Sequence, residues 1–90
     1  MRSLPNGLVA IAPGFRLQWE EAQRAYVLLY PEGMIKLNPS AAEILKRCDG
    51  SRKVDAIVAD LQQQYSGTDL SADVCEFLEV AYGRGWIGSR

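Results

Sequence analysis

The side chains of this sequence that could do chemistry are two cysteines and a few pairs of carboxylates. Cys48 and Cys75 lie far apart, form no CxxC motif, and have no histidine anywhere in the chain to accompany them. The sequence therefore predicts neither a zinc site nor a redox dithiol. Without histidine, a cysteine or serine nucleophile also lacks its usual base. Two buried, unreactive thiols are the simpler interpretation.

The carboxylate pairs Glu20/Glu21 and Glu76/Glu79 could in principle do acid–base work. They fall in a predicted turn and on a predicted helix surface, where nothing would shift their pKa values, so solvated charge is the simpler interpretation. No GxGxxG or Walker-type loop is present. We therefore expect no catalytic residue, no metal, no cofactor and no independent enzyme activity.

Length and charge limit the classes of protein further. The chain has 90 residues, of which 48% are hydrophobic and 23% charged, a composition typical of one small soluble domain. A formal net charge of −1 gives no overall attraction to nucleic acid or to an anionic membrane. The first residues, "MRSLPNGLVAIAPG", contain prolines and glycine that interrupt the apolar run needed for a secretory signal. We expect a cytoplasmic protein with a flexible N-terminal arm over residues 1–14 and one domain over residues 15–90.

Three strands are predicted after the arm. Apolar and polar residues alternate strictly from Phe15 to Glu20, as in a half-buried strand, and "RAYVLLY" is typical of a central strand. "YPEG" then supplies the proline and glycine of a tight hairpin turn. The third strand, Met34 to Leu37, has no later strand in the sequence to pair with its far edge.

Three helices follow the strands. The first begins either at Asn38, with Pro39 in the first turn, or at a capping box of Ser40 and Glu43, and Gly50 stops it. Apolar residues at helical spacing predict a second helix from residue 54 to 65 and a third from residue 71 to about 83 or 85. This order predicts an α+β fold in which a three-stranded antiparallel sheet is followed by a three-helix bundle.

The third helix and the third strand suggest a binding groove. The apolar arc of that helix, centred on Val74 and Leu78, is broader than packing on one neighbour requires. The helix is either wedged between two layers of its own domain or forms part of a groove wall. Beside it, an extended peptide could add to the open strand edge. Alternatively, Lys36 and the shortness of the strand only protect a bare edge from aggregation.

Two other functions are compatible with strands packed on three helices. A winged-helix DNA-binding module is one, but the third helix carries Asp73, Glu76 and Glu79 against only Arg84, and these carboxylates would repel phosphates. A self-associating scaffold is the other, in which "GLVAIAP" docks on a second copy to form a homodimer. We favour neither DNA nor a membrane as a partner.

The run from Arg16 to Val54, which contains "LLYPEGMIKLN" followed by "CDG", resembles the PqqD family of small peptide chaperones in pyrroloquinoline quinone (PQQ) biosynthesis. The likeness continues more loosely to "GWI" at residues 85–87. It implies a non-catalytic, winged-helix-like RiPP recognition element that binds a ribosomally made precursor peptide. It also implies presentation of this peptide to a radical S-adenosylmethionine (radical SAM) enzyme, which holds the cofactors.

The resemblance also implies where the peptide binds, by addition to the third strand and against the third helix. The implied contacts are Met34, Ile35, Lys36 and Leu37 on the strand and Cys75, Leu78, Glu79 and Tyr82 on the helix. We expect Lys36 to attract acidic groups of the peptide.

Overall fold

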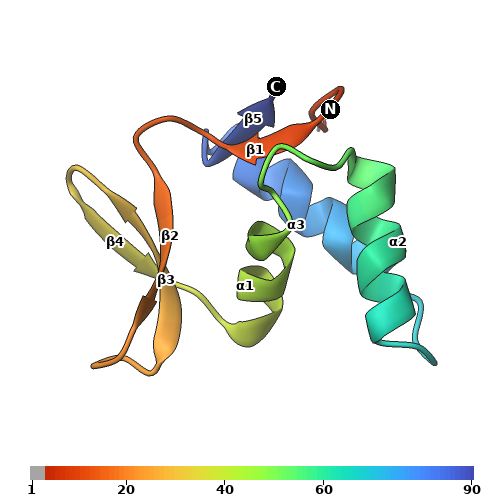
Figure 1. Cartoon of the computed structure of the whole chain (residues 1–90), viewed down its shortest axis with the longest axis horizontal. Coiled ribbons are helices and arrows are strands. Elements are labelled where there is room, and N and C mark those ends of the chain that lie inside the picture. Colours follow the sequence, from red (N-terminus) through yellow and green to blue (C-terminus); the bar gives the residue numbers. More distant parts are fainter. Residues whose placement is uncertain (1–3) are drawn as a thin grey trace.

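The strand-forming segments fold into the expected three-stranded antiparallel sheet. In the computed structural model, which describes residues 4–90, the strands β2 (Arg16–Glu20), β3 (Ala25–Tyr30) and β4 (Gly33–Lys36) are joined by hairpins in the order β2-β3-β4. Because the hairpins join neighbours in sequence, β3 is central and β4 lies at one edge (Figure 1). The predicted α+β fold class is confirmed.

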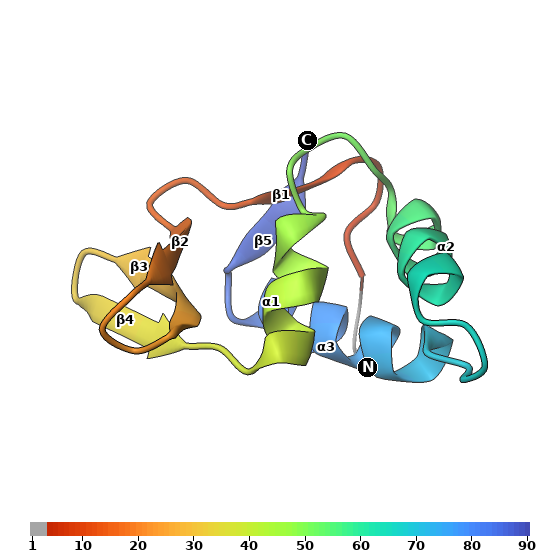
Figure 2. The same ribbon diagram turned by 60° about the horizontal axis from the view of Figure 1, so that its bottom comes forward.

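Three helices follow the sheet: α1 (Pro39–Lys46), α2 (Val54–Gln64) and α3 (Ser71–Gly83). Of the two predicted starts for α1, the structure adopts the first, because the Asn38 side chain accepts a hydrogen bond from the N–H of Ala41 at 2.8 Å. The sheet lies on one side of the molecule and the helices on the other (Figures 1 and 2). Within residues 4–90 no helix combines the length and the apolar character that crossing a membrane requires.

A second, two-stranded sheet corrects the prediction of a flexible arm over residues 1–14. Strand β1 (Val9–Ile11) pairs antiparallel with β5 (Ile87–Ser89), which follows the third helix and for which the sequence predicts no strand. The other edge of β1 is also occupied, since Val9 donates to the carbonyl of Arg52 and accepts from the N–H of Gly50, both at 2.8 Å. The segment from Leu4 onward is therefore part of the domain, and residues 1–3 of the predicted arm lie outside the described residues.

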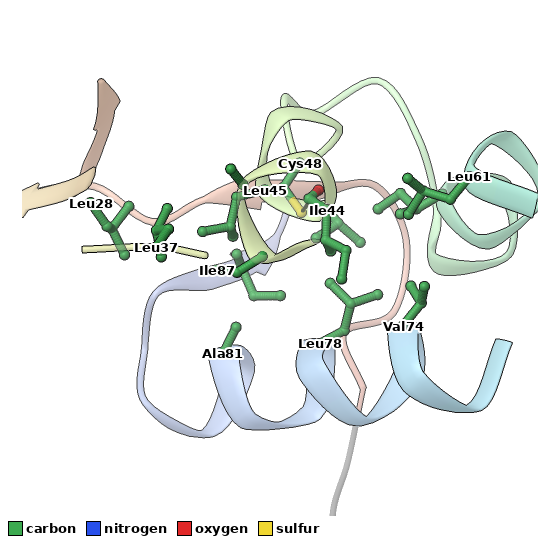
Figure 3. Packing of buried hydrophobic residues seen from close by; sticks show 14 residues of the cluster. Leu28, Leu37, Ile44, Leu45, Cys48, Leu61, Val74, Leu78, Ala81 and Ile87 are labelled. Carbon is green, nitrogen blue, oxygen red and sulfur yellow. Dashed lines mark hydrogen bonds between the residues drawn. The ribbon is translucent and has the colours of Figure 1, made fainter. Parts of the chain in front are cut away.

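The core lies where the sheet, the helices and β5 meet. Figure 3 shows the cluster: Leu28 and Leu37 from the sheet side, Ile44, Leu45 and Cys48 from α1 and its end, Leu61 from α2, Val74, Leu78 and Ala81 from α3, and Ile87 from β5. Each of these side chains is less than one-tenth exposed. Removal of this apolar surface from water is the main force that holds the elements together.

An arginine joins α1 to α2 at the surface of this core. Arg47 donates hydrogen bonds to the carboxylate of Asp60, to the side-chain amide oxygen of Gln64 and to both the carbonyl and the carboxylate of Glu43. The hydrogen bond from Arg47 lowers the pKa of Asp60, and hydrogen bonds from Lys46 and Arg47 lower the pKa of Glu43. The guanidinium therefore fixes the orientation of α1, whose first residues follow β4 directly.

We expect Val9→Ala to lower the free energy of unfolding by about 2 kcal/mol, because it removes two buried methyl groups from β1. The neighbouring Leu8, 37% exposed, provides the control: Leu8→Ala should cost less than about 0.5 kcal/mol. Chemical denaturation of both variants measures this difference. Equal, small losses would mean that β1 does not contribute to the core.

Candidate functional site

The outer edge of β4 carries backbone groups that the sheet leaves unpaired. The cross-strand partners are Val27 with Lys36 and Leu28 with Ile35, and the N–H of Leu37 donates to the carbonyl of Tyr26 at 3.0 Å. In an antiparallel ladder, residues alternate between pointing their N–H and C=O groups at the partner and away from it. The hydrogen bond of Leu37 therefore sets the phase: Ile35 and Leu37 point toward β3, whereas Met34 and Lys36 point outward.

The four predicted strand contacts thus separate into two pairs. The side chain of Leu37 is 6% exposed and that of Ile35 is half-buried, and both pack toward the core. Met34, which is 46% exposed, and Lys36 are accessible, and they also carry the outward-facing backbone groups. The sequence predicts the edge and the alternation of the side chains, with Ile35 and Leu37 on one face and Met34 and Lys36 on the other. Which pair carries the outward backbone groups depends on the register of pairing with β3.

A hollow of about 650 Å³, here called the Phe77 pocket, opens beside the end of β4. Asn38 and Pro39, which follow β4, form one end of it, and Phe77 and Val74 of α3 form a wall. Tyr65, at the end of α2, is 44% exposed and lines the same pocket. A chain that extends along β4 toward α1 would meet this largely apolar hollow.

The helix residues predicted as contacts lie elsewhere on α3. Leu78 is fully buried in the core, and none of Cys75, Glu79 and Tyr82 lines the Phe77 pocket. At 100° per residue, Phe77 and Cys75 fall on opposite sides of the buried stripe. The pKa of the Cys75 thiol is raised, first by burial and then by the carboxylates of Glu79 and Asp55, which places it toward the start of α2.

The structure therefore does not bring Cys75, Glu79 and Tyr82 together with β4 in one pocket. Their role as peptide contacts stays a prediction. Phe77 is the residue that sequence reasoning did not select, although the helical wheel placed it within the broad apolar arc. The available signal was its spacing from Val74, but only the position of α1 shows which flank of the helix faces the end of β4.

A second hollow, here called the Trp19 pocket, has a volume of about 450 Å³ and lies between the β2–β3 hairpin and α1. Trp19 and Tyr26 are the aromatic residues of its lining, and Arg24, Lys36 and Lys46 are the basic ones. The two pockets share the residues Asn38, Pro39 and Glu43. The junction of β4 with α1 is thus flanked by an apolar hollow and a basic, aromatic one.

Within the part of the chain that the structure describes, no three His, Cys, Asp or Glu side chains are grouped so as to hold a metal ion. Burial raises the pKa of the Cys48 thiol to about 12, so it is protonated at neutral pH and a poor nucleophile. What the region offers is an unpaired strand edge and two side-chain pockets, the features used to recognise an extended peptide.

Comparisons with known proteins identify the family of this chain. The profile of the family described as "Coenzyme PQQ synthesis protein D (PqqD)" matches residues 25–87. A protein of Azotobacter vinelandii named "PqqA binding protein" is 54% identical over 83 residues, which is 91% of this chain and 90% of that one. A protein of Methylococcus capsulatus with the same name is 49% identical, with 92% of this chain and 89% of that chain covered.

A solved structure shows the same fold. The solution structure of the PqqD part of Methylobacterium extorquens PqqCD, described as a functional, stand-alone RiPP recognition element, superposes with a TM-score of 0.70 at 28% identity. The match covers 88% of this chain and 86% of that one. The sequence and the fold together place this chain in the PqqD family.

Proposed function

We propose that this protein is a non-catalytic peptide chaperone of PQQ biosynthesis that binds the precursor peptide PqqA as an added strand on β4. It then presents the bound peptide to a radical SAM enzyme, in the cytoplasm. The observation that carries the proposal is the outward-facing backbone of Met34 and Lys36 at an uncovered sheet edge. The names of the relatives from Azotobacter and Methylococcus support the choice of peptide.

The free energies involved require that the edge of β4 does not bind the peptide alone. The N–H and C=O groups of Met34 and Lys36 can make about four hydrogen bonds, each with a net value of about 1 kcal/mol. Ordering the peptide backbone costs roughly 1–2 kcal/mol per residue, which cancels this gain. An apolar side chain that buries about 150 Å² in the Phe77 pocket adds about 4 kcal/mol. The pocket therefore supplies the affinity, while the edge supplies the direction and register of the peptide.

The non-catalytic part of the proposal rests on the side chains near this edge. Glu43, which lines both pockets, is held by Lys46 and Arg47, and these hydrogen bonds lower its pKa. A carboxylate with a lowered pKa is a weak base at neutral pH. The chain is thus suited to hold and orient a peptide for chemistry that the partner enzyme performs.

Strand addition predicts that Lys36→Pro weakens PqqA binding about 10-fold or more, because proline removes the outward N–H and places its ring on the edge. The hydrogen bonds from β3 should survive, because proline is tolerated where an edge strand faces solvent. Lys36→Ala, which keeps the N–H, is the matched control. Calorimetric titration with PqqA would contradict strand addition if the two variants bound equally well.

The Phe77 pocket gives a second prediction. Phe77→Ala and Tyr65→Ala should each weaken PqqA binding by about 10-fold, a typical effect of removing an aromatic contact. Tyr65 is largely exposed, so its variant tests the pocket without the loss of stability that Phe77→Ala also brings. Cys75→Ala, on the other flank of α3, should change affinity less than 2-fold. The reverse order of effects in the same titration would place the peptide on the Cys75 flank.

A further inference from the structure

The lining of the Trp19 pocket is basic, although the chain as a whole is slightly acidic. Three of its lining residues are basic, Arg24, Lys36 and Lys46, and one is acidic, Glu43. The whole chain has a formal net charge of −1, and the lining of the Phe77 pocket contains acidic residues but no basic one. Of the two hollows beside the β4–α1 junction, only the Trp19 pocket favours an anion.

The single carboxylate does not neutralise this pocket. Glu43 accepts from Lys46 at 3.0 Å and from Arg47 at 3.1 Å, so two cations already share its charge. The side chains of Arg24 and Lys36 form no ion pair within residues 4–90. Of the basic residues in the lining, Arg24 and Lys36 therefore have no ion-pair partner among the described residues.

Arg24 occupies a backbone conformation that its side chain does not favour. Its φ is +51°, and it is the one non-glycine residue of the described chain with a positive φ. It lies in the turn between β2 and β3, where its N–H donates to the carbonyl of Glu21 at 3.1 Å. Glycine or asparagine would adopt this left-handed conformation at lower cost. An arginine kept in a strained position beside a pocket suggests a use for its guanidinium.

Aromatic rings give the pocket a firm wall. The rings of Trp19 and Tyr26 pack edge to face with centroids 5.2 Å apart, and the ammonium of Lys46 lies 4.5 Å from the centre of the Tyr26 ring. Trp19 is nevertheless 47% exposed, as accessible as Met34 at 46%. An exposed tryptophan beside unpartnered cations fits an acidic side chain whose apolar stem contacts the indole.

From these observations we propose that the Trp19 pocket binds a carboxylate side chain of the same peptide that adds to β4. The inference rests on the proposed function. It assigns the carboxylate to the peptide because the pocket is continuous with the edge: Lys36 belongs to both, and Leu37 and Asn38, which follow the strand, also line the pocket. A residue of the peptide near Lys36 can therefore enter the pocket while its neighbours pair with β4.

The test is a double-mutant cycle between Arg24→Asn and a set of PqqA peptides in which each Asp or Glu in turn is replaced by Asn or Gln. Asparagine tolerates a positive φ, so the variant should fold and melt at an equal or higher temperature. We expect Arg24→Asn to weaken binding of unmodified PqqA about 5-fold at low salt, as for a partly exposed ion pair. One of the altered peptides lacks the carboxylate that enters the pocket. For that peptide, Arg24→Asn should cause no further loss of affinity.

Two controls separate the pocket from general electrostatics. Arg24→Lys keeps the positive charge and should retain most of the affinity. Arg16→Gln removes one positive charge, as Arg24→Asn does, but Arg16 does not line the Trp19 pocket. Arg16→Gln should therefore change affinity less than 2-fold. Equal effects of Arg24→Asn on every peptide, or no effect on any, would overturn the inference while leaving the proposed function intact. Failure of the unaltered protein to bind PqqA would instead overturn the proposed function.

Discussion

The unpaired outer edge of β4 is the constraint on which the candidate site depends. A hydrogen bond from Leu37 to Tyr26 sets the phase of the ladder, so that Ile35 and Leu37 are used by the sheet while Met34 and Lys36 are left for a partner. The same alternation sends the side chains of Ile35 and Leu37 into the core. Folding and recognition therefore use alternate residues of one short strand, and a shift of one residue in register would exchange them.

The helices determine what lies beside this edge. Asn38 caps α1 immediately after β4, and Arg47 at the other end of that helix binds Asp60 and Gln64 of α2. With α1 fixed at both ends, one hollow lies between it and α3 and another between it and the β2–β3 hairpin. A short, rigid module of this kind can read both the backbone and the side chains of an extended peptide without a deep cleft.

Local signals predicted most of the fold. Alternation in β2, the proline and glycine of the β3–β4 turn and the Asn38 cap are each contained within a few residues, so the sequence alone places these elements. The pairing of β1 with β5 is not local, since it joins Val9–Ile11 to Ile87–Ser89, and no pattern in either segment indicates its partner. The segment with prolines and glycine was therefore predicted as a flexible arm.

The open edge of β4 could be predicted from the sequence, whereas the flank of α3 that faces it could not. An edge strand can be inferred from the order of elements, because the sequence predicts no strand after β4. The later strand that the structure contains, β5, pairs with β1 and does not cover β4. Which flank of α3 faces that edge depends on the packing of α1, and the helical wheel is symmetric in this respect. It therefore did not distinguish Phe77 from Cys75, and it did not show that Leu78 is fully enclosed.

Amide hydrogen exchange, followed by NMR in the free protein and with saturating PqqA, tests the central claim most directly. In the free protein, the amides of Ile35 and Leu37 should exchange slowly and those of Met34 and Lys36 rapidly, because only the first pair donates to β3. Strand addition predicts that PqqA slows the exchange of Met34 and Lys36 by about 10-fold or more, so that all four amides become protected. Saturation with PqqA that left Met34 and Lys36 exchanging as rapidly as before would contradict the account.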